Sequence, residues 1–480
     1  MKIRIIILLL ASVVSGLQAN AFCGFYVARA DAKLFNNRSE VILARHGNKT
    51  VVTMSNDFQG EVKDFAMVVP VPVVLQEEDI KVVTNRIFEK LNEYSAPRLV
   101  EYYDENPCQP IIEMKELSDI AMSLSFTEDF APAMSGRMYN EYQVKIEAEY
   151  EVGEYDILIL SAKESTGLRR WLIDNDYKVP RDADEVLEPY IKSKMNFFVV
   201  KVNLDRMPLN SSDFLSPIQI SYESDRFMLP IRLGMANANG PQDLIIYALT
   251  DQGRVECTNY RTVKMPTDRN IPLFVQEKFG DFYKSVYEKK WRQEHENAIL
   301  LEYAWDVSPQ QPVKCDPCVG PPPINNDLAE AGVDWLGNNG FGGRAYFTRL
   351  HVRYERKNFP QDLFFQVTPN TDRFQCRYVL THPARGDMSC PSGQIYLQDL
   401  EMRRKKELDE LAALTSWDVK YGNSYVKEFA NQKKENKQII IPGANDGSGG
   451  SDFPWTLPLT FLTMVVVTTA YQYIRRKAIA

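Results

Sequence analysis

Histidine is scarce in this chain, with four among 480 residues, at His46, His295, His351 and His382. They are isolated in the sequence, so no spacing typical of a zinc site includes them. The motifs H-E-x-x-H, G-x-S-x-G and G-x-x-x-x-G-K-[ST] are also missing. The sequence therefore predicts no catalytic residue, no metal ligands and no cofactor, and it leaves open whether the protein is an enzyme.

Basic residues are also in short supply. The chain has 56 Lys and Arg against 64 Asp and Glu, a net charge of −8. A nucleic-acid-binding protein needs a basic surplus to displace counterions from phosphates, so we expect no nucleic-acid partner. Hydrophobic residues make up 44% and charged residues 25%, which is ordinary for a folded protein and excludes a wholly disordered chain.

Residues 1–21 have the features of a secretory signal peptide. Two basic residues precede an apolar run over residues 5–14, which is too short to span a bilayer comfortably. Ala19 and Ala21 then form a small-x-small cleavage site in front of Phe22. We therefore predict that the mature chain begins at Phe22.

A second apolar segment, residues 453–474, contains no charged residue over 22 positions. At about 1.5 Å per residue, a helix of this length can cross a hydrocarbon core of about 30 Å. Its ends carry aromatic residues, as transmembrane helices do at the two interfaces, and three cations follow it at once. These anchor residues are Trp455, Tyr471, Tyr473, Arg475, Arg476 and Lys477.

The two ends together predict a single-pass membrane protein whose partner at the C-terminus is the lipid bilayer. Residues 435–452 form a flexible Gly/Ser-rich linker, and residues 475–480 form a short cytoplasmic tail. The bulk of the chain would be extracytoplasmic, in the periplasm or on the cell surface. A C-terminal sorting tail that a membrane protease removes is the alternative.

The region between the ends predicts an α+β fold with a large mixed or mostly antiparallel β component and several helices. Alternating apolar and polar residues, as in Val144, Ile146, Ala148 and Tyr150, are typical of half-buried antiparallel strands. Helical periodicity predicts helices over residues 77–94, 165–174, 184–193, 276–295 and 394–415. A change from strand-dense to helix-containing sequence suggests two regions, 22–270 and 271–434.

Several runs make the chain resemble a known but uncharacterised bacterial family, the domain of unknown function 2330. They are FNN at 35–37, NDFQG at 56–60, FAMVVPVP at 65–72, APRLV at 96–100, LSPI at 215–218, MLPIRLGMAN at 228–237, NYRTV at 259–263 and CDPC at 315–318. The resemblance covers roughly residues 23–380. It implies an exported envelope protein in a bacterial setting and supplies no activity, substrate or catalytic residue.

Seven cysteines, an odd number, face the oxidising compartment that export implies. Proximity in sequence favours two pairs, Cys315 with Cys318 and Cys376 with Cys390, although the sequence does not fix the connectivity. Cys315 and Cys318 form a C-x-x-C motif, for which a structural disulfide, a thiol–disulfide redox centre and half of a zinc site are all open. Three prolines at 321–323 exclude an α-helix directly after the motif, which favours the structural disulfide.

The function that the sequence favours is that of an uncharacterised envelope protein. Its extracytoplasmic domain would bind a ligand or another envelope protein, or serve a structural role. An extracytoplasmic enzyme is the alternative, with thiol–disulfide chemistry at Cys315 and Cys318 as the only version that names residues.

Overall fold

The structure of the chain is a computed structural model. The structure describes residues 25–26, 39–56, 66–109, 143–175, 177, 179, 183–206, 215–236, 240–318, 320–337, 340, 342–418 and 424–427. Residues 1–426 form one compact unit, and residues 427–480 form another, of which only Lys427 is described.

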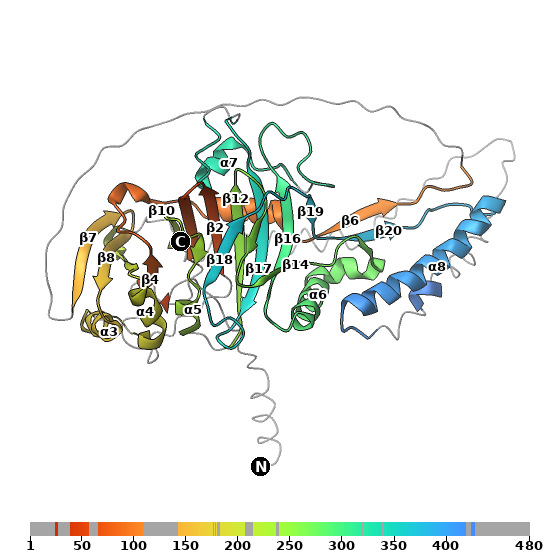
Figure 1. Ribbon diagram of the computed structural model, residues 1–480. Coiled ribbons are helices and arrows are strands. Elements are labelled where there is room, and N and C mark those ends of the chain that lie inside the picture. The colour runs from red at the N-terminus through yellow and green to blue at the C-terminus, as the bar shows by residue number, and fades with distance from the viewer. Residues whose placement is uncertain are drawn as a thin grey trace, which may run out of the picture. The chain divides into compact units, whose positions relative to one another are not determined.

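The centre of the first unit is a nine-stranded sheet with the order β14-β16-β17-β12-β2-β3-β10-β5, in which β19 also pairs with β16 (Figure 1). Neighbouring strands are antiparallel except for the parallel pairs β2–β12 and β14–β16. The strands are β2 (Ser39–His46), β3 (Lys49–Asn56), β5 (Ile80–Val82), β10 (Leu215–Glu223), β12 (Gln242–Thr250), β14 (Arg261–Lys264), β16 (Ala298–Asp306), β17 (Tyr346–Tyr354) and β19 (Phe374–Gln375).

Three smaller sheets surround this one. A five-stranded antiparallel sheet has the order β1-β4-β9-β8-β7, and two three-stranded sheets have the orders β11-β18-β13 and β15-β20-β6, the last of them parallel. Their strands are β1 (Phe25–Tyr26), β4 (Ala66–Val71), β6 (Arg98–Tyr103), β7 (Val144–Val152), β8 (Tyr155–Ala162), β9 (Asn196–Val202), β11 (Met228–Leu229), β13 (Val255–Cys257), β15 (Arg269–Asn270), β18 (Leu363–Val367) and β20 (Arg377–His382).

Helices cover the sheets. The α-helices are α2 (Arg86–Ser95), α3 (Ser165–Asp174), α4 (Ala183–Lys192), α5 (Arg232–Ala236), α6 (Phe279–Gln293), α7 (Asn325–Glu330) and α8 (Pro391–Leu414). Short 3-10 helices are η2 (Glu77–Asp79), η3 (Leu204–Arg206) and η4 (Leu273–Lys278). No helix among these residues is long and apolar enough to cross a membrane, and the predicted span 453–474 lies outside the described part of the chain.

The nine-stranded sheet is buried on both faces, and strand alternation explains how. Val41 and Leu43 point from β2 into one core cluster, while Ile42 and Ala44 point from the same strand into another. The second of these clusters contains residues of α2 and α7, and a third cluster packs α3 and α4 against the five-stranded sheet. Because both faces of the sheet are covered, its strands are hydrophobic at successive positions and not only at alternate ones.

The α+β class is confirmed, and one detailed helix prediction is wrong. Residues 77–94 do not form one helix, because residues 80–82 pair with β10 as the edge strand β5 and the helix begins only at Arg86. The two regions suggested by the sequence, 22–270 and 271–434, both contribute to the nine-stranded sheet, in which β2, β3 and β10 come from the first region and β16 and β17 from the second.

Candidate functional site

The terminal residues predicted to carry export and anchoring lie outside the described residues. They are Ala19, Ala21, Phe22, Trp455, Tyr471, Tyr473, Arg475, Arg476 and Lys477. The cysteines at 108, 257, 315, 318, 376 and 390 are described, and they test the sequence-based pairing.

Cys315 and Cys318 form a disulfide bond within their loop. In a redox-active C-x-x-C centre, a partner thiol must be able to reach the first cysteine. Here the first cysteine, Cys315, is buried, and the second, Cys318, is exposed. The next described helix, α7, begins only at Asn325, so Cys315 does not lie at the start of that helix, where a thiolate would be stabilised. The arrangement is that of a structural disulfide.

The predicted pair Cys376–Cys390 is wrong, because Cys390 is bonded to Cys108. β6 and β20 run parallel, so Cys108 and Cys390 both follow the C-terminal ends of adjacent strands. Cys376 precedes β20 and is separated from that end by six strand residues, about 20 Å. Cys376 is fully buried as a free thiol, and burial raises its pKa far above the ordinary value, so it is not a reactive cysteine.

A buried network of charges crosses three neighbouring strands of the nine-stranded sheet. Glu302 of β16 is fully buried and accepts hydrogen bonds from Arg349 Nε at 2.5 Å and from His351 Nδ1 at 2.8 Å. His351 Nε2 lies 3.2 Å from Asp243 Oδ1 of β12, and Arg353 binds the same carboxylate with two bonds of 2.8 Å. Since both ring nitrogens of His351 face carboxylates, the ring is held as an imidazolium.

The pKa shifts in this network follow from its neighbours. Burial alone would raise the pKa of Glu302, but Arg349, His351 and the hydroxyl of Tyr283 outweigh it and hold the pKa at about 2. Burial alone would lower the pKa of His351, and the two carboxylates raise it instead. Because carboxylates engage both ring nitrogens of His351, neither nitrogen is free to accept a proton from a substrate.

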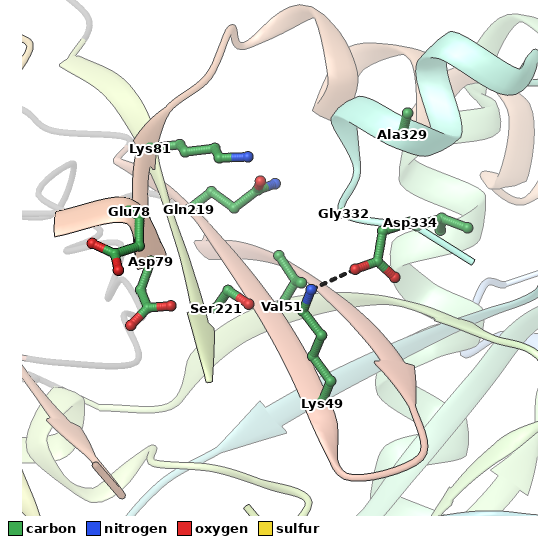
Figure 2. Close-up of a pocket in the computed structure, with 11 residues that line it drawn as sticks. Lys49, Val51, Glu78, Asp79, Lys81, Gln219, Ser221, Ala329, Gly332 and Asp334 are labelled. Atoms are coloured by element: carbon green, nitrogen blue, oxygen red, sulfur yellow. Dashed lines mark hydrogen bonds and ion pairs between the residues drawn. The ribbon is translucent and has the colours of Figure 1, made fainter. Parts of the chain in front are cut away.

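A polar cleft opens where β3, β10 and the η2–β5 segment meet α7 and the loop after it (Figure 2). Its volume is about 250 Å³. Its lining residues come from four separate stretches of the sequence, and most are polar or charged. They are Lys49, Val51, Glu78, Asp79, Lys81, Gln219, Ser221, Ala329, Gly332, Val333 and Asp334.

The cleft brings together charges of both signs. Figure 2 shows Glu78 and Asp79 on one side and Asp334 on the other, where Asp334 pairs with Lys49 at 2.5 Å. Lys81 and Glu78 make no hydrogen bond or ion pair with any residue that the structure describes. An unpaired cation and an unpaired anion are therefore available on the wall of one concavity.

The remaining polar groups are positioned by the fold. The side-chain amide of Gln219 donates to Thr53 Oγ1 at 2.8 Å and to the carbonyl of Glu330 at 3.0 Å, which leaves its oxygen as an acceptor. Gly332 has a φ of +94°, and a Cβ at this position would lie 2.6 Å from Val51 Cγ1. Glycine therefore lets the chain after α7 approach β3 and close that side of the cleft.

The sequence contains no signal for this cleft, because its residues belong to no motif and are brought together only by pairing of β3 with β10 and of β10 with β5. It also missed the charge network, since Glu302 lies in a strand that is apolar on both sides. The structure groups no three His, Cys, Asp or Glu side chains into a metal-binding cluster within its described part.

The family of this chain follows from a comparison with known protein families. A family profile described as an uncharacterized protein conserved in bacteria, the domain of unknown function 2330, matches residues 17–366. The chain belongs to this family. The matched region contains every cleft residue and ends before Cys376, β20 and α8. No curated protein and no solved structure matches the chain.

Proposed function

We propose that this family member is a membrane-anchored envelope protein whose extracytoplasmic domain binds a small zwitterionic ligand in the polar cleft. The observation that carries the proposal is that Lys81 and Glu78, on the wall of one concavity, pair with no residue in the described part of the chain. Ligand sites are concave, and a few convergent polar groups in them fix the orientation of the ligand.

The charges define the chemical class of the ligand. Lys81 provides an ammonium group for a carboxylate, and Glu78 and Asp79 provide carboxylates for an ammonium group. Gln219 and Ser221 add hydrogen-bonding groups to the cleft, and Figure 2 shows Gln219 beside Lys81 and Ser221 between Asp79 and Lys49. A volume of about 250 Å³ holds about eight water molecules at about 30 Å³ each, which corresponds to a ligand of dipeptide size.

Membrane anchoring rests on the sequence. The signal peptide at residues 1–21 and the apolar segment 453–474 support an extracytoplasmic location for the cleft, with the lipid bilayer as the C-terminal partner. Binding would therefore occur outside the cytoplasm.

The binding proposal is tested with three dipeptide probes that differ in which of their two ends is charged. The full-length protein in phosphatidylcholine nanodiscs is unfolded thermally and followed by tryptophan fluorescence, with glycylglycine, N-acetylglycylglycine or glycylglycinamide present. We expect glycylglycine alone to raise the unfolding temperature, because it alone has both charged ends, and a bound ligand stabilises the folded state in proportion to ln(1 + [L]/Kd).

The Lys81→Ala variant should lose this effect. Lys284→Ala is the matched control, since Lys284 is an exposed lysine on α6 outside the cleft, and it should keep the effect. Equal stabilisation by all three probes, or an unchanged response of Lys81→Ala, would contradict the proposal.

A further inference from the structure

A second hollow lies beside the five-stranded sheet. Its walls are the start of β7, the end of β8 and the C-terminal end of α4. Its volume is about 520 Å³. Val144, Ile191 and Met195 are buried side chains of the third core cluster that also line this hollow, so its floor is apolar. This size and this floor suit the hydrocarbon part of a small molecule.

The charged groups around the hollow are all cationic. Lys145, Lys163 and Lys194 line it, and no acidic residue of the described chain does. Lys145 is neutralised by Glu147, whose carboxylate lies 2.5 Å from its ammonium group. Lys163 and Lys194 make no hydrogen bond or ion pair through their side chains with any described residue. Two ammonium groups are thus available to an anion at the rim of an apolar floor.

The backbone conformation at Lys194 favours glycine, so the fold itself does not explain why a lysine is present at this position. Its φ is +55°, and it ends α4 with the hydrogen bonds Lys194 N to Ile191 O and Met195 N to Tyr190 O. This is a Schellman motif, in which the left-handed position is usually glycine because a Cβ is unfavourable there. Gln143, which also lines the hollow, has a φ of +58°. Residues held in this conformation cluster at ligand-binding sites, where the side chain has a use that offsets the strain.

We infer that the hollow bounded by Lys163, Lys194 and the floor of Val144, Ile191 and Met195 binds an anionic amphiphile, with its charged head at the two lysines and its hydrocarbon chain on the floor. The proposal is independent of the polar cleft, which shares no residue with this hollow. Either a soluble carboxylate or an anionic lipid has the required chemistry.

The test measures the reactivity of individual lysines in the full-length protein. Acetylation by an amine-specific reagent is followed by mass spectrometry in phosphatidylcholine nanodiscs, with octanoate, octyltrimethylammonium or inorganic phosphate as the probe. At a probe concentration of twice the Kd, we expect octanoate to slow acetylation of Lys163 and Lys194 about threefold, because only the unbound fraction reacts. Lys192 of the same helix does not line the hollow and is the internal reference.

A second arm identifies the source of the ligand. Nanodiscs that contain phosphatidylglycerol replace octanoate, and protection of the same two lysines there would assign the site to a membrane lipid, whereas protection by octanoate alone would assign it to a soluble anion. Equal protection by inorganic phosphate would contradict the proposal that the ligand is an amphiphile, because the apolar floor would then contribute nothing to binding. Protection of Lys192 to the same extent, or no protection by either amphiphile, would overturn the site.

The Lys194→Gly variant separates binding from folding. Because glycine suits the left-handed position, this variant should have a higher unfolding temperature than the parent protein, while octanoate protection of Lys163 falls. Lys192→Gln is the control and should keep full protection. A Lys194→Gly variant that retains protection of Lys163 would show that Lys194 is not part of the site.

Discussion

Replacing Glu302 with glutamine tests whether the buried charge network stabilises the protein. The substitution keeps the shape of the side chain and removes the charge between Arg349 and His351. Arg349 would keep its hydrogen bonds to Asn92 Oδ1 and Ser95 Oγ, at 2.8 and 3.3 Å, but it would lose the carboxylate that neutralises it. Removing one partner of a buried ion pair costs about 3–5 kcal/mol, because the other charge stays buried without compensation. We expect Glu302→Gln to lower the free energy of unfolding by that amount.

The pH dependence of stability gives a second measure of the same network. The folded-state pKa of His351 is raised above its ordinary 6.5, so its contribution is complete below about pH 6.5 and is lost as the pH rises through the raised value. The folded-state pKa of Glu302 is lowered from 4.5 to about 2, so its contribution is complete above about pH 4.5 and is lost as the pH falls towards 2. The network should therefore stabilise the fold most between about pH 4.5 and 6.5. In Glu302→Gln, the pKa of His351 should fall, and the loss of stability at high pH should begin at a lower pH.

Urea unfolding of the parent protein and the variant at several pH values measures both effects. Glu105→Gln is the matched control, since Glu105 is exposed and makes no side-chain contact that the structure records, and it should change stability by less than about 0.5 kcal/mol. In the double variant Glu302→Gln/Arg349→Met, the loss should be smaller than the sum of the two single losses, because the uncompensated charge is gone. If Glu302→Gln lowers the free energy of unfolding by less than about 1 kcal/mol and leaves its pH dependence unchanged, the network does not stabilise the fold as argued.

Three further predictions concern other parts of the molecule. Replacing Cys108 and Cys390 with serine should lower the free energy of unfolding in urea by about 2–5 kcal/mol. Replacing Cys315 and Cys318 with serine should lower it by less, because the first bond joins residues 282 apart and the second joins residues three apart. The reverse order of the two losses would contradict this prediction. Gly332→Ala should cost about 1–3 kcal/mol in the same assay because its Cβ would meet Val51, whereas Gly280→Ala in α6, where a Cβ meets nothing, should be neutral or stabilising. Protease treatment of spheroplasts that carry a C-terminal epitope tag should digest the ectodomain and leave a small protected tagged fragment, and survival of the full-length tagged band would exclude the proposed topology.

The sequence predicted the elements whose pattern is local. Alternation identified β7, and helical periodicity identified α3 within its observed bounds. It failed at β16, where eight of nine residues are buried, because a strand covered on both faces has no alternation to detect. It failed also at residues 80–82, where pairing with β10 decides the structure. The pairing of Cys108 with Cys390 and the assembly of the cleft depend in the same way on contacts between strands far apart in the chain, which a single sequence does not display.

The bond between Cys108 and Cys390 also has a consequence for the order of events during synthesis. Four other cysteines, at 257, 315, 318 and 376, lie between these two. If the chain is oxidised as it emerges on the far side of a membrane, Cys108 encounters Cys257 long before Cys390 is available. Pairing in the order of emergence would then join Cys108 to Cys23 or to Cys257, and Cys257 is a buried free thiol in the folded protein. The native bond therefore requires that Cys108 either waits until most of the chain has been made or is released from a wrong bond by thiol–disulfide exchange.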